Sequence, residues 1–203
     1  MNKLPQTFYE RKDVVEIAKE LIGKIVVSEI NGKLTSGRIV ETEAYVAIVD
    51  KASHSFNARR TPRNEDMYAV GGTVYIYICY GMHQMLNIVT NKKNIPDAIL
   101  IRAIEPIEGI DIMLERTGKP QSDFTLTKGP GNAGKALGIC KEHSGVHIRG
   151  DKIYIVEDKK FILPPQQIGV SKRIGVEPAG EDALLPYRFY LKGNKYVSGR
   201  PVI

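Results

Sequence analysis

A chain of 203 residues, 42% of them hydrophobic, is long enough to bury one sizeable core. Its formal net charge of +6 favours a polyanionic partner. The two cysteines stand far apart with no Cys-x-x-Cys pattern, which excludes a disulfide scaffold, an iron–sulfur cluster and a four-cysteine zinc site. The first residues form no apolar leader and no stretch reaches membrane-spanning length, so we expect a cytoplasmic protein.

Apolar spacing and turn residues divide the first part of the chain into a helix, a hairpin and a short helix. The elements predicted are a helix over residues 11–21, strands over residues 24–29 and 33–45, and a helix over residues 64–69. Gly23 ends the first helix, and Asn31-Gly32 joins the two strands, because this pair is typical of tight hairpin turns. Asn64 is expected to cap the short helix with its side chain.

The remainder of the chain predicts more strands than helices. Strands are expected over residues 73–79, 84–91, 98–104, 152–156 and 187–191, and helices over residues 107–116 and 132–137. The strands cluster without regular βαβ alternation, and no repeat or linker divides the sequence. We therefore expect a single α+β domain over residues 1–203, with a mostly antiparallel sheet.

An acidic pair stands in the second predicted strand. Side chains alternate along a strand, so Glu41 and Glu43 share one face of residues 38–45. An unpaired buried charge is costly, so each glutamate either pairs with an arginine or lies on a solvated face. Arg102 is a further charge inside an apolar run and needs a carboxylate, phosphate or carbonyl partner.

A tyrosine-rich ribbon follows the acidic pair. On residues 73–79, Tyr75 and Tyr77 share a face, and Val74, Ile76 and Ile78 share the other. One interpretation is a hairpin that buries its Val/Ile side and exposes its tyrosines. The other makes a tyrosine the wall of a pocket for a flipped base, with Tyr80 at the turn as a wedge.

Several basic residues surround these segments. Arg59, Arg60 and Arg63 form either a solvated basic loop or a set of phosphate contacts. Residues 128–135 precede a helix but lack the spacing of a nucleotide-triphosphate loop. The cysteines form no deaminase-type zinc motif, so we expect no metal.

Taken together, these residues closely resemble the alkyladenine (3-methyladenine) DNA glycosylase family, the mammalian-type enzymes that also occur in bacteria. The matching segments, in order, are residues 38–45, 54–55, 61–64, 72–82, Asn87 and residues 100–106. The resemblance implies a monofunctional glycosylase that flips damaged purines out of duplex DNA and hydrolyses the N-glycosidic bond. The purines it implies are 3-methyladenine, 7-methylguanine, hypoxanthine and ethenoadenine.

The resemblance also implies a role for individual residues. Glu43 matches the general base that activates water, and Tyr80 matches the intercalating tyrosine. The residues matching the substrate pocket are Tyr45, His54, Tyr77, Asn87 and Arg102, and the expected DNA-backbone contacts are Arg59, Arg63, Met82, Lys128 and Lys135.

The implied fold is one α+β domain around a curved, mostly antiparallel sheet, with a tyrosine hairpin that protrudes into the minor groove. The implied partner is double-stranded DNA with damaged purines, bound by a nucleoid-associated monomer with no cofactor.

The sequence departs from the family pattern at three places: Val46-Ala47, Asn132-Ala133 and His83-Gln84-Met85. Three other functions also use some of these features. A non-catalytic single-strand binder would explain the charge and the aromatic residues but leave Glu43 without a role. A glycosylase/lyase would need a lysine nucleophile, and no lysine occupies the matching motifs. A carbohydrate glycosidase also uses carboxylates, but the basic balance does not favour it.

Overall fold

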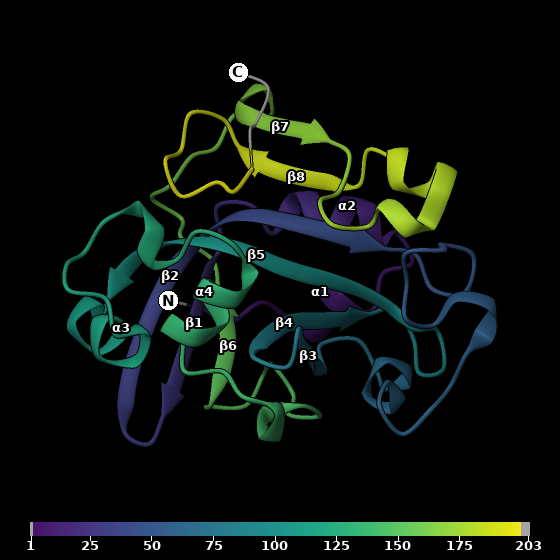
Figure 1. Ribbon diagram of the computed structural model, residues 1–203, viewed down its shortest axis with the longest axis horizontal. Helices are drawn as coiled ribbons and strands as arrows, with labels where there is room; N and C mark the ends of the chain where they lie inside the picture. Colours follow the sequence, from purple (N-terminus) through teal and green to yellow (C-terminus); the bar gives the residue numbers. More distant parts are fainter. Residues whose placement is uncertain (1, 200–203) are drawn as a thin grey trace.

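A computed structural model describes residues 2–199 and places all of its named strands in one sheet (Figure 1). Every pairing between these strands is antiparallel. The main path of the sheet runs in the order β3-β4-β5-β2-β1-β6, while β8 pairs with β2 and β7 pairs with β8. The expected α+β fold with a mostly antiparallel sheet is confirmed. The strands are β1 (Ile25–Ile30), β2 (Lys33–Tyr45), β3 (Val74–Cys79), β4 (His83–Thr90), β5 (Asp97–Glu108), β6 (Ile153–Val156), β7 (Ile168–Ser171) and β8 (Arg188–Leu191).

The long strand β2 changes one of its neighbours partway along. Its first half pairs with β1, and Glu41 to Glu43 pair with β8 instead, opposite Tyr190 to Arg188. β5 lies along the other edge of β2, with register shifts on both sides of Glu41. Such irregularities re-aim side chains locally. The acidic segment is thus enclosed between two strands, and both glutamates are fully buried.

Short helices cover the sheet. Ile17, Ala18 and Leu21 of the α2 region are buried, and the Thr42 hydroxyl of β2 donates to the Ala18 carbonyl at 2.8 Å. On α4, a Cβ at Gly134 would lie 2.3 Å from the Gln84 carbonyl, so only glycine allows this close approach to β4. The helices are α1 (Gln6–Tyr9), α2 (Val14–Glu20), α3 (Ile110–Thr117) and α4 (Pro130–Ala136). The 3₁₀ turns are η1 (Phe56–Ala58), η2 (Glu65–Tyr68), η3 (Phe124–Leu126), η4 (Lys141–His143), η5 (Pro165–Gln167) and η6 (Glu177–Leu184).

The structure corrects three local predictions and adds two short elements that were not predicted. β5 continues through Pro106, so the helix predicted from residue 107 begins at Ile110 instead. Asn64 does not cap η2; its side chain accepts from the Thr61 amide at 2.7 Å and holds the preceding loop. Ile78 is 49% exposed rather than buried with its strand neighbours. The sequence patterns missed α1 and β7, each only four residues long.

Within the described residues, no helix combines the length and apolar character needed to cross a membrane.

Candidate active site

A cavity of about 300 Å³ opens where β2, β3, β4 and β5 meet the loop that follows β2. Residues far apart in the sequence share its lining. The residues predicted from the sequence that line it are Tyr45, His54, Tyr77, Tyr80, Asn87 and Arg102.

Glu43 lies behind the cavity wall and contacts three of its lining residues, Tyr45, Arg102 and Ile174. Its Oε2 accepts from the Tyr45 hydroxyl at 2.8 Å, and its Oε1 lies 3.2 Å from an Nη1 donor of Arg102. Oε1 also accepts from the backbone amide of Ile174 at 2.8 Å. Burial raises the pKa of Glu43, against the opposing effects of Arg102, Ile174 and Tyr45. A carboxylate with a raised pKa is a stronger base than a solvent-exposed one.

Glu41 shares the Glu43 face, as predicted, because both carboxylates contact Arg102. The solvated-face alternative is wrong for both glutamates, since neither is exposed. Glu41 Oε1 also accepts from Arg188 Nε at 2.7 Å, and its Oε2 accepts from the Ser198 amide at 2.7 Å. Glu41 is therefore fully committed to partners inside the protein.

Further aromatic rings line the cavity. The rings of His54 and Tyr77 meet edge to face with centroids 4.5 Å apart, and His54 Nδ1 lies 2.8 Å from the Tyr75 hydroxyl. Partial burial, with a smaller effect of the Arg59 charge, lowers the pKa of His54, so this imidazole is neutral at pH 7. Burial raises the pKa of Tyr77 to about 12. These rings are therefore uncharged at neutral pH.

Asn87 projects from β4 into the same cavity. It is 3% exposed, and its Nδ2 donates to the Met85 carbonyl at 3.0 Å. Because the amide nitrogen is used on the backbone, the side-chain oxygen is the atom left to meet a ligand.

Arg173 braces the cavity from behind Tyr45. Its guanidinium lies 4.8 Å from the centre of the Tyr45 ring and is paired with the buried Asp50 carboxylate. Arg173 also donates to the Ala44 carbonyl at 2.9 Å. The next residue is Ile174, so this ion pair fixes both a pocket wall and the amide that binds Glu43.

The turn between β3 and β4 carries the residues expected to meet DNA. Tyr80 is 88% exposed and Met82 is 71% exposed. A second hollow of about 690 Å³ lies next to the cavity and shares His54, Tyr77 and Tyr80 with it. Arg59 and Arg63 line this second hollow.

The two lysines expected on the DNA backbone lie elsewhere. Lys128 Nζ approaches the Lys195 carbonyl at 3.5 Å, and Lys135 Nζ donates to the Thr117 carbonyl at 3.2 Å. Neither residue is among those that line the two hollows. Asn132, one of the departures from the family pattern, donates to the Lys128 carbonyl at 2.9 Å and so has a local structural role.

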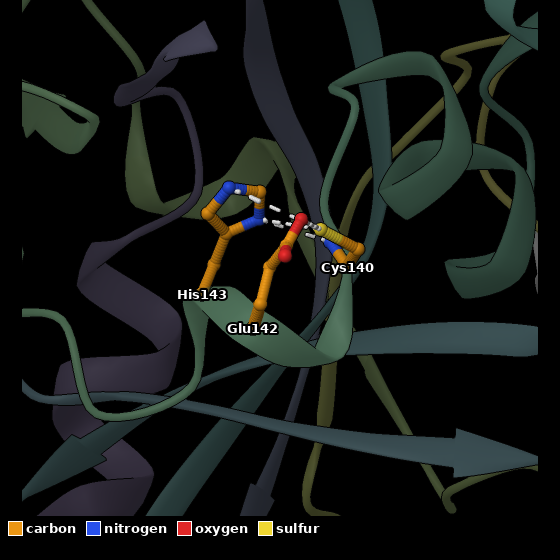
Figure 2. A group of neighbouring side chains, drawn as sticks. All are labelled: Cys140, Glu142 and His143. Atoms are coloured by element: carbon orange, nitrogen blue, oxygen red, sulfur yellow. Dashed lines mark hydrogen bonds between the residues drawn. The ribbon is translucent and has the colours of Figure 1, made fainter. Parts of the chain in front are cut away.

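Among the described residues, one group of three has donor atoms close enough to be considered for a metal ion: Cys140, which precedes η4, and Glu142 and His143 within it (Figure 2). These groups bond to one another. Cys140 Sγ lies 3.0 Å from Glu142 Oε1, and the Cys140 amide donates to His143 Nδ1 at 3.1 Å. Burial and Glu142 raise the pKa of the Cys140 thiol to about 11. In this structure the three residues form a hydrogen-bonded turn.

The sequence patterns missed several residues that build the site. Arg173 and Asp50 carry no motif that pairs them across 123 positions, and the Ile174 amide is a backbone group with no signature at all. Ser198 gives no signal either. Arg188 could have been found from the sequence. It is a charged residue at the start of a short apolar strand, and a buried charge needs a partner.

Comparison with known proteins gives a consistent result. The family described as methylpurine-DNA glycosylase (MPG) matches residues 7–195. A protein of Clostridium novyi with the name "Putative 3-methyladenine DNA glycosylase" is 46% identical over 205 residues, covering 98% of this chain and 99% of its own length. Proteins with the same name from Clostridium acetobutylicum and Chlamydia felis are 44% and 45% identical, covering 97% and 95% of this chain and 97% of their own length in both cases.

Proposed function

This chain belongs to the methylpurine-DNA glycosylase family and is a DNA-3-methyladenine glycosylase, a hydrolase of the N-glycosidic bond, and we propose that Glu43 activates the water that its reaction consumes. The proposed substrates are alkylated and deaminated purines: 3-methyladenine, 7-methylguanine, hypoxanthine and ethenoadenine. The proposed acting form is a monomer on nucleoid DNA, and the product is an abasic site.

One observation carries this proposal: a fully buried carboxylate lies directly behind a cavity lined by aromatic rings. Glu43 contacts Tyr45 and Arg102, which both line that cavity. Burying a carboxylate costs folding free energy, even when an arginine pairs with it. This cost favours a functional role for Glu43. A carboxylate next to a ring-lined pocket supplies what base hydrolysis needs, a proton acceptor and a negative charge near the sugar.

The reaction follows from this arrangement. A water attacks the C1′ atom of the flipped nucleotide on the sugar face away from the base, and Glu43 accepts its proton. The bond between C1′ and the base nitrogen breaks, and its electron pair leaves with the base. The Glu43 charge stabilises the oxocarbenium-like sugar as the bond breaks. A base alkylated at N3 or N7 is cationic, so it leaves as a neutral molecule without help from an acid.

The proposed pocket selects the base by stacking and by shape. In this proposal the Tyr45 and Tyr77 rings, which line the cavity, stack on a cationic purine, and such contacts favour it over a neutral one. His54 closes the edge of the pocket. Asn87, which lines the cavity, has the proposed role of opposing the exocyclic amine of normal guanine. Tyr80 fills the gap that the flipped base leaves in the duplex, and flipping costs least where pairing is already weak.

The direct test is Glu43→Gln, which keeps the shape of the side chain and removes its capacity to accept a proton. We expect base release in single-turnover assays to fall by at least about 100-fold, the usual contribution of a general base. Affinity for DNA with an abasic analogue should stay within about threefold of the wild type, by fluorescence anisotropy.

Glu20→Gln is the matched control, since Glu20 pairs with Arg11 on the surface. Substantial base release by Glu43→Gln would contradict the proposal. Borohydride trapping adds a second arm, because a covalent protein–DNA adduct would indicate a lysine nucleophile instead of water.

A further inference from the structure

Arg102 is held at three of its donor groups by partners from two parts of the chain, strand β2 and the C-terminal segment. Its Nε donates to Glu41 Oε1 at 2.9 Å, and its Nη2 donates to the Ser198 hydroxyl at 3.2 Å. Its Nη1 lies 3.2 Å from Glu43. The guanidinium is planar and its N–H donors have fixed directions. When Nε and Nη2 are both bonded, the direction of Nη1 is therefore fixed as well.

Ser198 makes hydrogen bonds through its hydroxyl, its backbone amide and its backbone carbonyl. Its hydroxyl donates to Glu41 Oε1 at 2.8 Å while accepting from Arg102, which uses one hydrogen and one lone pair of the hydroxyl oxygen. Its amide donates to Glu41 Oε2 at 2.7 Å. Its carbonyl accepts from Arg188 Nη2 at 2.6 Å. A serine that is 8% exposed is thus fixed at three atoms.

We propose that Ser198 and Glu41 are positioning residues of the glycosylase, which orient Arg102 so that its Nη1 faces Glu43. The inference rests on the proposed role of Glu43. The C-terminal segment then completes the active site, because Ser198 lies 157 positions from Glu41 in the sequence.

The alternative is that this cluster only stabilises the fold. The geometry favours positioning, since a purely structural ion pair would leave the third side of Arg102 to any acceptor, whereas here it faces the reacting carboxylate. Arg188 also donates to Glu41 through its Nε, but its Nη1 donates to the Ser171 hydroxyl at 2.9 Å and not to Glu43. One arginine of the cluster therefore serves the site directly, and the other anchors the C-terminal segment.

Loss of this orientation has a specific electrostatic consequence. The charged or titratable groups that act on Glu43 are Arg102, Glu41, Tyr45, Tyr77 and Arg173. The arginines stay charged at all working pH values, and the tyrosines stay neutral because their pKa values are raised. An Arg102 that drifts from Glu43 weakens the attraction that favours the ionised carboxylate. The acidic limb of the pH–rate profile should then move to higher pH.

The test uses Ser198→Ala in the full-length chain, with single-turnover release of 7-methylguanine from duplex DNA across the pH range. We expect the rate constant at neutral pH to fall about tenfold, with the acidic limb displaced upward by roughly half a pH unit or more. Affinity for abasic-analogue DNA should stay within about twofold. Ser198→Thr keeps the hydroxyl and should restore both the rate and the limb.

Ser171→Ala is the matched control, since it removes a hydroxyl bonded to Arg188 but not to Arg102. Its rate and its acidic limb should match those of the wild type. Ser198→Cys fills the same space with a weak hydrogen-bonding group, so it provides the test if the alanine variant fails to fold.

A Ser198→Ala profile superimposable on the wild type overturns the inference, as does an equal loss in Ser171→Ala. If Glu43→Gln is inactive in the same assay, the proposed function survives either result. If Glu43→Gln releases base, the proposed function itself fails.

Discussion

Asp97 is a buried carboxylate outside the active site, and it makes the stability of the protein depend on pH. It is 3% exposed at the start of β5, and its Oδ2 accepts from Asn91 Nδ2 at 2.8 Å. Burial raises its pKa to about 6, and the Asn91 hydrogen bond only partly offsets this. The folded state therefore binds a proton more readily than the unfolded chain, where an aspartate has a pKa near 3.9.

We predict that Asp97→Asn stabilises the protein at pH 7.5. The ionised carboxylate costs the folded state most above about pH 6, and this cost disappears as the pH falls toward 4. A neutral amide avoids it at every pH. The expected gain is about 1 to 3 kcal/mol at pH 7.5 and clearly less at pH 5, measured by urea unfolding. An equal change at both pH values would show that Asp97 is not the titrating group.

Single residues of the site were predictable where a side-chain pattern announced them. Strand alternation placed Glu41 and Glu43 on one face, and the charge of Arg102 within an apolar run required a partner. Only the family resemblance distinguished the two glutamates. The Ile174 amide and Ser198 were not predictable, because a backbone donor and an isolated serine look the same in a loop as in a buried network.

The hairpin of β3 and β4 places a bulky residue in a backbone conformation that is typical of glycine. Tyr80 has a φ of 50° and Gly81 a φ of 73°, the pattern of the Asn31-Gly32 turn between β1 and β2. A left-handed conformation costs a bulky L-residue roughly 1 kcal/mol. Tyr80 is 88% exposed, so burial of its ring does not offset that cost.

We predict that Tyr80→Gly stabilises the fold while it weakens DNA binding. The free energy of unfolding should rise by about 0.5 to 1 kcal/mol in urea titrations. Affinity for abasic-analogue DNA should fall at least about tenfold, because the wedge is gone. Asn31→Gly is the comparison, since asparagine tolerates this conformation and its replacement should change neither quantity much. A Tyr80→Gly variant that is both less stable and fully active would contradict the prediction.

Elements with local signals were predicted well, and those without them were not. The Asn31-Gly32 turn and the strands beside it follow from turn chemistry and apolar pattern alone. β7 spans four residues and is held by its pairing with β8. A short segment of sequence does not predict such pairing. The strand predicted over residues 98–104 ends too early, because Pro106 still pairs with Gly37 near the end of β5, where the register of β2 shifts.

At the scale of the whole molecule, the site forms only when the C-terminal part of the chain packs beside β2. β8 pairs with the acidic segment, the loop after β7 supplies the Ile174 amide, and Ser198 follows from the last described turn. The antiparallel α+β class was predictable from strands that cluster without alternating helices. The enclosure of β2 by β5 and β8 was not, since contacts between strands far apart in the chain leave no periodic trace in one sequence.

The net charge of the molecule makes a last prediction possible, on the salt dependence of DNA binding. Arg59, Arg60 and Arg63 lie on one exposed loop, but their surroundings differ. Arg60 is paired with Glu65 and also donates to Asn94 at 3.1 Å. Arg59 and Arg63 line the second hollow and have no ion pair within residues 2–199.

A free arginine that neutralises a phosphate releases counterions on binding, whereas a paired one must first give up its carboxylate. We therefore expect Arg59→Gln and Arg63→Gln each to lower the slope of log affinity against log salt by about 1, and Arg60→Gln to leave it nearly unchanged. Anisotropy titrations on undamaged duplex DNA at several salt concentrations measure these slopes. Equal slopes for all three variants would contradict this prediction. They would mean that the loop acts through its overall charge, because direct phosphate contacts would give the three arginines different contributions to the slope.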